Sequence, residues 1–162
     1  MMTIRQAQKS DLESISDLIT RTVTTGESVS GWDSNYPTID IFIRDIDSGH
    51  LYLYENNNKI SGIIAIIPGP DADYKDIIWE ASGKALILHR LCVDPSYRKQ
   101  GIASGLMQYA ETFARREKYK SLQLDTRECN STAIALYKKL GYKQTGIITR
   151  DRGTFFCYEK VL

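Results

Sequence analysis

The sequence predicts one α/β domain built around a mixed β-sheet. Apolar segments of strand length alternate along the chain with segments in which apolar residues recur at helical spacing. The 162 residues are enough for one domain with its own core, and we find no repeat, low-complexity segment or linker that would divide them. We therefore expect a single domain over residues 1–162.

The composition is typical of an ordinary globular protein. Hydrophobic residues make up 42% of the chain and charged residues 25%, and the net charge of +1 provides no overall attraction to nucleic acid. No apolar run approaches the roughly 20 residues of a membrane-spanning helix, and the polar start lacks the core of a signal peptide. We expect a cytoplasmic protein with neither nucleic acid nor a membrane as partner.

The three cysteines, Cys92, Cys129 and Cys157, lie far apart and form no C-x-x-C pair. Their number and spacing argue against a disulfide framework and against a zinc site. We therefore expect reduced thiols and no bound metal.

The chain begins with a short strand, Thr3–Gln6, and an amphipathic helix. Ser10 and Glu13 fit a capping box at the start of this helix, whose apolar stripe comprises Leu12, Ile15, Leu18, Ile19 and Val23. The next segment, Glu27–Pro37, contains large aromatic residues that a purely solvated loop would not need, so we expect it to pack over another part of the protein.

A second helix and a hairpin follow. Thr38 can cap a helix over Ile39–Asp47, and we expect its carboxylates to form a solvated face; they are Asp40, Asp45 and Asp47. A cluster of three asparagines then predicts a turn between the strands His50–Glu55 and Lys59–Ile67.

An acidic segment separates this hairpin from the next strand. It contains Asp71, Asp73, Asp76 and Glu80. Such carboxylates are typical of a solvated loop, and they could also attract a cationic substrate.

The central stretch, Ala85–Met107, predicts a buried strand, a basic turn and a helix. The first turn of a helix has backbone N–H groups without internal partners, and the small residues Gly101 and Ala103 let an anion approach them. Arg98 and Lys99 add positive charge, and arginine matches the geometry of phosphate. The spacing fits a polyphosphate ligand and fits equally a plain structural turn.

The second half continues with alternating elements. The helix that begins at Gly101 ends near Lys118 and precedes a strand over Ser121–Thr126. Asn130 can cap a helix over Ser131–Leu140, which Gly141 ends, and the last two strands are Tyr142–Ile148 and Thr154–Val161.

Two motifs resemble those of the GNAT superfamily of acetyl-coenzyme A-dependent N-acetyltransferases. The first, Arg98-x-x-Gly101-x-Ala103, matches the superfamily's Q/R-x-x-G-x-G/A pyrophosphate loop. The second matches the helix after its fifth strand and comprises Asn130, Ala133, Leu136, Tyr137, Leu140, Gly141 and Tyr142. The specific matches lie between Leu88 and Tyr142, and the N-terminal third matches in outline.

The resemblance implies a fold, a reaction and a partner. It implies a GNAT-like domain with a central, mostly antiparallel seven-stranded sheet, about four helices and splayed strands 4 and 5. It also implies transfer of an acetyl group from acetyl-CoA to a primary amine by direct attack in a ternary complex, with the acceptor left unnamed. The alternatives are a non-catalytic coenzyme A-binding or regulatory module and a nucleotide-binding protein. A final strand near the C-terminus is compatible with a homodimer.

The resemblance also implies which residues bind coenzyme A. The pyrophosphate would lie against Arg98, Lys99, Gln100, Gly101, Ile102, Ala103 and Ser104. The pantetheine arm and the thioester would run along the backbone of Leu91, Cys92 and Val93. Asn130 either reaches toward the cofactor or serves only as the N-cap of its helix.

Tyr137 matches the superfamily's general acid, although its spacing also fits an apolar-face aromatic. His89 could accept a proton from the amine, or it could be a hydrogen-bonded core histidine; Glu80 or no protein base are the other options. Trp32 and Tyr36 correspond in position to the region that shapes the acceptor pocket, and they could instead pack over the sheet. Cys129 is expected to be structural, because direct transfer needs no covalent nucleophile.

Overall fold

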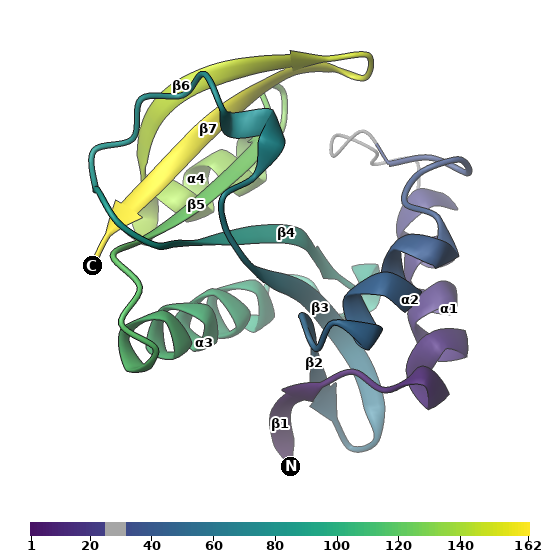
Figure 1. Ribbon diagram of the computed structural model, residues 1–162. Helices are drawn as coiled ribbons and strands as arrows, with labels where there is room; N and C mark the ends of the chain where they lie inside the picture. Colours follow the sequence, from purple (N-terminus) through teal and green to yellow (C-terminus); the bar gives the residue numbers. More distant parts are fainter. Residues whose placement is uncertain (25–31) are drawn as a thin grey trace. The chain divides into compact units, whose positions relative to one another are not determined.

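The computed structural model describes residues 1–24 and 32–162, so the first part of the predicted Glu27–Pro37 loop lies outside the described residues. Within them the chain forms seven strands and four α-helices (Figure 1). The strands follow the order β1-β2-β3-β4-β5-β7-β6. β4 pairs with β5 in parallel, whereas β1–β2, β2–β3, β5–β7 and β6–β7 are antiparallel. These observations confirm the predicted α/β class with a mixed, mostly antiparallel sheet.

The described residues form two compact units. One comprises residues 1–24, 32–66 and 90–109, and the other comprises residues 67–89 and 110–162. The single N-acetyltransferase domain over residues 1–162 stays a prediction. None of the helices in the described part of the chain is both long and apolar enough to cross a membrane.

The first unit contains an antiparallel arrangement of β1 (Met2–Gln6), β2 (Leu51–Asn56) and β3 (Lys59–Pro68). The β2–β3 connection is short because Asn57 and Asn58 both take a positive φ, of 48° and 62°. Asparagine tolerates this conformation better than most residues, which is why the asparagine cluster predicted the hairpin correctly.

The helix α1 (Leu12–Thr24) buries Ile15, Leu18 and Ile19, as its apolar stripe predicted. The predicted cap at Ser10 is wrong. A 3₁₀ turn over Lys9–Asp11 precedes the helix, and its capping box joins Gln8 and Asp11. The Asp11 carboxylate takes this role because two guanidinium nitrogens of Arg5 hold it at 2.9 Å.

The helix α2 (Ile39–Asp47) follows Thr38, which occupies the N-cap position without a side-chain hydrogen bond. The prediction that Asp45 lies on a solvated face is wrong, since this residue is 3% exposed. Its carboxylate is buried because Arg90 of β4 (Ala85–Val93) supplies a guanidinium at 2.7 Å.

The second unit is organised around β5 (Ser121–Arg127), which pairs with β4 from Ala85↔Ser121 to Leu88↔Leu124. On its other side β5 pairs with β7 (Gly153–Val161), and β7 forms a hairpin with β6 (Lys143–Arg150), drawn in yellow in Figure 1. A core cluster of this unit comprises Tyr74, Ile87 and Cys157, with Ile77, Trp79 and Ile148 packed against it.

The remaining two α-helices are α3 (Ile102–Arg116) and α4 (Ser131–Lys139). Asn130 caps α4, because its Oδ1 accepts a hydrogen bond of 3.2 Å from the Ala133 amide. At the other end of α4 the Lys160 ammonium donates to the Leu140 carbonyl at 2.7 Å and to both carboxylate oxygens of Glu111 at 2.9 Å. This ammonium satisfies a C-terminal carbonyl of α4 and ties the helix to β7 and α3.

Candidate acetyl-coenzyme A and catalytic site

The turn that enters α3 has the backbone conformation of an anion cradle. Lys99 and Gly101 take positive φ angles of 63° and 79°. The first hydrogen bond of the helical ladder joins the Gly105 amide to the Gly101 carbonyl at 2.9 Å. The amides of residues 102–104 precede that bond, where a helix offers no carbonyl to them. This end of the helix therefore presents several backbone donors together with its positive dipole end.

The cradle is open where a ligand would lie. A Cβ atom built on Gly101 meets no atom of the described residues within 4 Å. Gly62 of β3 shows the opposite, because a Cβ there would lie 2.8 Å from the Ile102 side chain. The start of α3 is thus packed closely against β3 while the turn before it stays open. These features are compatible with the pyrophosphate group that the resemblance implies for this turn.

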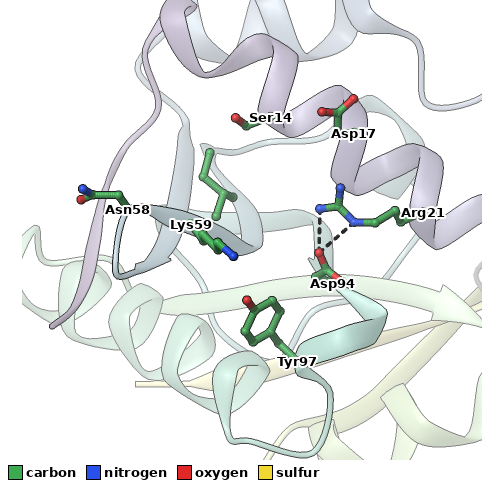
Figure 2. A pocket seen from close by; sticks show the side chains of 8 residues that line it. Ser14, Asp17, Arg21, Asn58, Lys59, Asp94 and Tyr97 are labelled. Carbon is green, nitrogen blue, oxygen red and sulfur yellow. Dashed lines mark hydrogen bonds and ion pairs between the residues drawn. The ribbon is translucent and has the colours of Figure 1, made fainter.

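A buried aspartate anchors the chain just before this turn. The Asp94 carboxylate accepts two hydrogen bonds from the Arg21 guanidinium, at 2.6 and 3.0 Å (Figure 2). It also accepts one from the Ser96 amide. Its side chain is only 4% exposed. Arg21 and Asp94 line a cavity of about 370 Å³ together with Ser14, Asp17, Asn58, Lys59, Ile60 and Tyr97. The ion pair joins α1 to the end of β4 and so fixes where the cradle begins.

A local irregularity interrupts β4 directly before Leu91–Val93. Arg90 has a φ of +54°, which is unusual for a residue other than glycine and interrupts the regular pleat. Two of its guanidinium nitrogens, Nε and Nη2, lie 2.7 Å from Asp45 Oδ2. Both side chains are more than nine-tenths buried, so α2 holds the irregular residue in place.

The Cys92 side chain in this stretch is a buried thiol. Its sulfur lies 3.3 Å from the Thr22 hydroxyl of α1. Burial raises the pKa of the Cys92 thiol to about 11, with smaller opposing effects from Thr22 and Arg98. The thiol therefore stays protonated at neutral pH and is a poor nucleophile.

In the second unit, Tyr137 is held near the end of α4 among other aromatic rings. It is 6% exposed, and its ring centroid lies 6.0 Å from that of Tyr142 and 5.8 Å from that of Tyr158. Burial raises the pKa of the Tyr137 phenol, and the nearby Asp125 carboxylate raises it further. Tyr137 consequently remains a protonated hydrogen-bond donor throughout the physiological pH range.

The Asp125 carboxylate is the centre of a polar network in the same unit. Tyr74 donates its hydroxyl proton to Asp125 at 2.5 Å, and the Arg150 guanidinium binds both carboxylate oxygens at 3.0 and 3.1 Å. Arg150 also donates to Asp73 at 3.1 Å. Asp73 is therefore paired, and this observation favours a structural role for part of the acidic segment.

His89 belongs to the same unit. Its Nε2 lies 2.8 Å from Asp71 Oδ2, and its side chain is 21% exposed. The structure thus gives His89 a carboxylate partner that the sequence did not reveal. The hydrogen bond from His89 lowers the pKa of Asp71, against the opposing effect of burial.

The two aromatic residues expected near the acceptor differ in exposure. Trp32 is 9% exposed, which favours the packing alternative. Tyr36 is half-buried, and its backbone forms a bridge with Asp33, whose carboxylate accepts from the amides of Asn35 and Tyr36. Both residues lie in the first unit with the cradle, whereas His89, Asn130 and Tyr137 lie in the second.

Comparison with known proteins identifies the chain's relatives. A model of the acetyltransferase (GNAT) family matches residues 12–142. The chain belongs to the GNAT acetyltransferase family. The family uses acetyl-CoA, and this membership supports the prediction of an acetyl-CoA-dependent acyltransferase. Among residues 1–24 and 32–162, no group of three or more His, Cys, Asp or Glu side chains could hold a metal ion.

The chain is similar in sequence to several N-acetyltransferases. The human N-acetyltransferase 8 is 33% identical over 106 residues, which are 65% of this chain and 41% of the relative. An uncharacterized N-acetyltransferase of Bacillus subtilis, YesJ, is 24% identical over 93% of this chain and 84% of its own length. The chain therefore covers less than half of the human protein and most of the bacterial one.

Solved GNAT structures share the fold. An acetyltransferase of this family from Streptococcus agalactiae has a TM-score of 0.83 and 25% identity, covering 99% of this chain and 95% of that one. The NatC complex bound to Gag peptide and CoA has a TM-score of 0.75 and 20% identity, covering 99% and 98%. At 20% identity the second likeness bears on the fold alone.

Sequence reasoning missed three ion-pair partners of residues in or next to β4. Asp45, Asp71 and Arg21 each make an ion pair with a residue of, or directly after, β4. Their partners lie 45, 18 and 73 residues away in the sequence. The one local signal is the position of Asp71 at the start of a turn, which marks a cap and not a partner.

Proposed function

We propose that this protein transfers an acetyl group from acetyl-CoA to a primary amine by direct attack. The observation that carries the proposal is the open turn with positive φ angles at Lys99 and Gly101 before α3, in a member of the GNAT family. Backbone donors there suit a pyrophosphate, which acetyl-CoA carries and which binds well at a helix N-terminus. Arg98 and Lys99 would add positive charge to this contact.

The backbone of Leu91–Val93 is assigned to the acetyl end of the cofactor. An attacking amine makes the thioester carbonyl oxygen negative, and an amide N–H aimed at that oxygen stabilises it by about 2.7–4 kcal/mol. The irregular φ of Arg90 directly before this stretch supports the assignment, because it frees the following backbone from the regular strand pattern.

Tyr137 is assigned as the general acid. When the carbon–sulfur bond breaks, the sulfur needs a proton, and a phenol that stays protonated can donate it. The proton lost by the amine nitrogen restores the phenol, so the tyrosine is unchanged after each turnover. Burial of Tyr137, which keeps it protonated, supports this role.

A proton must also leave the amine before it attacks, since free lysine-like amines have a pKa of about 10. We assign this step to His89, and we assign contact with the acceptor to Tyr36.

Asn130 is assigned to α4 as its cap, since its side-chain oxygen accepts a hydrogen bond from the Ala133 amide. The acetyl group would then pass directly between cofactor and amine without a covalent enzyme intermediate.

The substitution Tyr137→Phe tests the reaction. We expect kcat to fall by about 100-fold or more while the KM for acetyl-CoA stays the same, because general acids typically contribute 10²–10⁴-fold. Tyr142→Phe is the matched control. The Tyr142 hydroxyl is buried and has no hydrogen-bond partner among the described residues, so its removal should leave turnover unchanged.

Equal turnover by the Tyr137→Phe and parent proteins would contradict the general-acid assignment. A parent protein that binds acetyl-CoA and acetylates none of a broad set of amines would instead favour the non-catalytic coenzyme A-binding module. Calorimetric titration with coenzyme A and a colorimetric assay of its released thiol separate these two outcomes.

A further inference from the structure

The imidazole of His89 is held from one side only. Its Nε2 contacts Asp71 Oδ2 at 2.8 Å. In the described part of the chain the structure gives Nδ1 no hydrogen-bond partner, and the side chain is 21% exposed. One ring nitrogen is therefore fixed by Asp71, and the imidazole stays partly exposed.

Asp71 is itself immobilised. It is the N-cap of the 3₁₀ turn Ala72–Tyr74, and its Oδ1 accepts the Asp73 amide proton at 2.8 Å. Its backbone carbonyl accepts from the Tyr74 amide at 3.0 Å. Since one carboxylate oxygen caps the turn, the other is left pointing at His89 in a fixed direction.

The neighbouring polar groups have other partners. The Tyr74 hydroxyl donates to Asp125, although its ring centroid lies 6.3 Å from that of His89. Arg150 is bound to Asp125 and Asp73. Asp71 is consequently the group that decides which nitrogen of His89 carries the proton.

We propose that Asp71 is a positioning residue: its carboxylate accepts the Nε2–H proton of His89 and keeps the lone pair of Nδ1 free to take a proton from the acceptor amine. The proposal rests on the proposed function and deepens it. A carboxylate that fixes a histidine tautomer in this way also stabilises the imidazolium that forms.

The proton transfer balances without any further reactant. The acceptor enters as an ammonium ion and gives one N–H proton to Nδ1 of His89, leaving a neutral amine and an imidazolium. The amine nitrogen bonds to the thioester carbon, and the carbon–sulfur bond breaks while Tyr137 protonates the leaving sulfur. The second N–H proton of the nitrogen then restores the Tyr137 phenol. The imidazolium returns its proton to solvent, and Asp71 remains ionised throughout.

Asp71→Asn tests the proposal in two independent measurements. Asparagine retains the oxygen that caps the turn, but its NH₂ group can donate to Nε2 of His89 and so favour the opposite tautomer. In ¹⁵N NMR spectra at about pH 8, above the reference pKa of histidine, we expect the Nε2–H tautomer in the parent and the Nδ1–H tautomer in the variant. Because the chain has only two histidines, His89→Gln assigns the signal.

The second measurement is turnover. We expect Asp71→Asn to lower kcat by about 10–100-fold with an unchanged KM for acetyl-CoA, the range typical of groups that orient a reacting residue. Asp76→Asn is the matched control, because it removes the same charge from an exposed position of the same segment. It should change neither the spectrum nor kcat. Thermal unfolding of each variant shows whether it is folded.

Three results would overturn the proposal. They are a Nδ1–H tautomer in the parent, parental turnover by Asp71→Asn, and lost turnover with unchanged His89 nitrogen shifts, which indicates a purely structural role. A parent protein that acetylates none of the amines tested contradicts the proposed function and, with it, the catalytic role of His89. The tautomer of His89 is measured without turnover, so an Nδ1–H tautomer contradicts the role of Asp71 whether or not the protein is active.

Discussion

At the scale of single residues, the backbone of Gly101 sets the strictest requirement of the candidate site. Its φ of +79° lies in the left-handed region, where a side chain costs about 1–2 kcal/mol. No atom of the described residues crowds the position of a Cβ, so the conformation and not packing requires glycine. A ligand in the open cradle would add a second reason for a residue without a side chain.

Two substitutions separate these reasons. Gly101→Ala should lower the free energy of unfolding by about 1 kcal/mol and weaken acetyl-CoA binding, because it adds both strain and a methyl group. Gly101→Asn should recover most of the stability, since asparagine tolerates the left-handed region, while coenzyme A still binds weakly. Urea denaturation and calorimetric titration measure the two effects. Parental affinity in both variants would show that no ligand approaches this turn.

At the scale of elements, α2 and β4 are joined by one buried ion pair. Asp45 and Arg90 have side-chain exposures of 4% and 8%, and Arg90 has the irregular φ before Leu91–Val93. Removing one member of a buried pair leaves the other charge without compensation, which is far more costly than losing a pair at the surface. The pair therefore couples the position of the helix to the conformation of the strand that we assign to the acetyl group.

We expect Asp45→Ala to lower the free energy of unfolding by about 3–5 kcal/mol, as found when buried ion pairs are broken. Asp47→Ala on the same helix is the control. Its carboxylate is 53% exposed and lies 3.3 Å from the Lys9 ammonium, so its loss should cost less than about 1 kcal/mol. Urea denaturation of both variants checks the difference, and equal effects would mean that the Asp45–Arg90 pair contributes no more than a surface contact.

At the scale of the whole molecule, ionised carboxylates link stability to pH. Hydrogen bonds from Arg5 lower the pKa of Asp11, and the hydrogen bond from His89 lowers the pKa of Asp71. A lowered folded-state pKa means that the unfolded chain binds protons first as the pH falls. This contribution to stability is complete above the unfolded pKa of about 3.9 and disappears as the pH falls through the folded value.

The double variant Asp11→Asn, Asp71→Asn should therefore have a flatter dependence of unfolding free energy on pH below about pH 4 than the parent. Urea denaturation at a series of pH values from neutral to acidic gives both curves. Parallel curves would contradict the roles of Arg5 and His89 in stabilising these carboxylates.

A structural feature can be predicted from the sequence when the residues that stabilise it lie close together along the chain. Asn130 as a helix cap and the asparagine turn between β2 and β3 were predicted correctly, because their partners lie within a few residues. Asp45 was predicted on the wrong face, because the charge that permits its burial lies 45 residues away. The partner of His89 was missed for the same reason. The motifs indicated the turn that we assign to the cofactor, whereas the ion pairs around it depend on tertiary contacts that a local pattern does not show.

In the proposed reaction this chain moves an acetyl group from acetyl-CoA to an amine. The most direct test incubates the parent protein with acetyl-CoA and, in turn, protein N-termini, lysine peptides, polyamines, amino acids and aminoglycosides, while the released thiol and the acetylated amine are quantified together. The proposed function predicts that one class releases thiol in equal amount to the acetylated amine, and that Tyr137→Phe abolishes most of this release. Tight binding of acetyl-CoA with no amine-dependent thiol release in any class would contradict it.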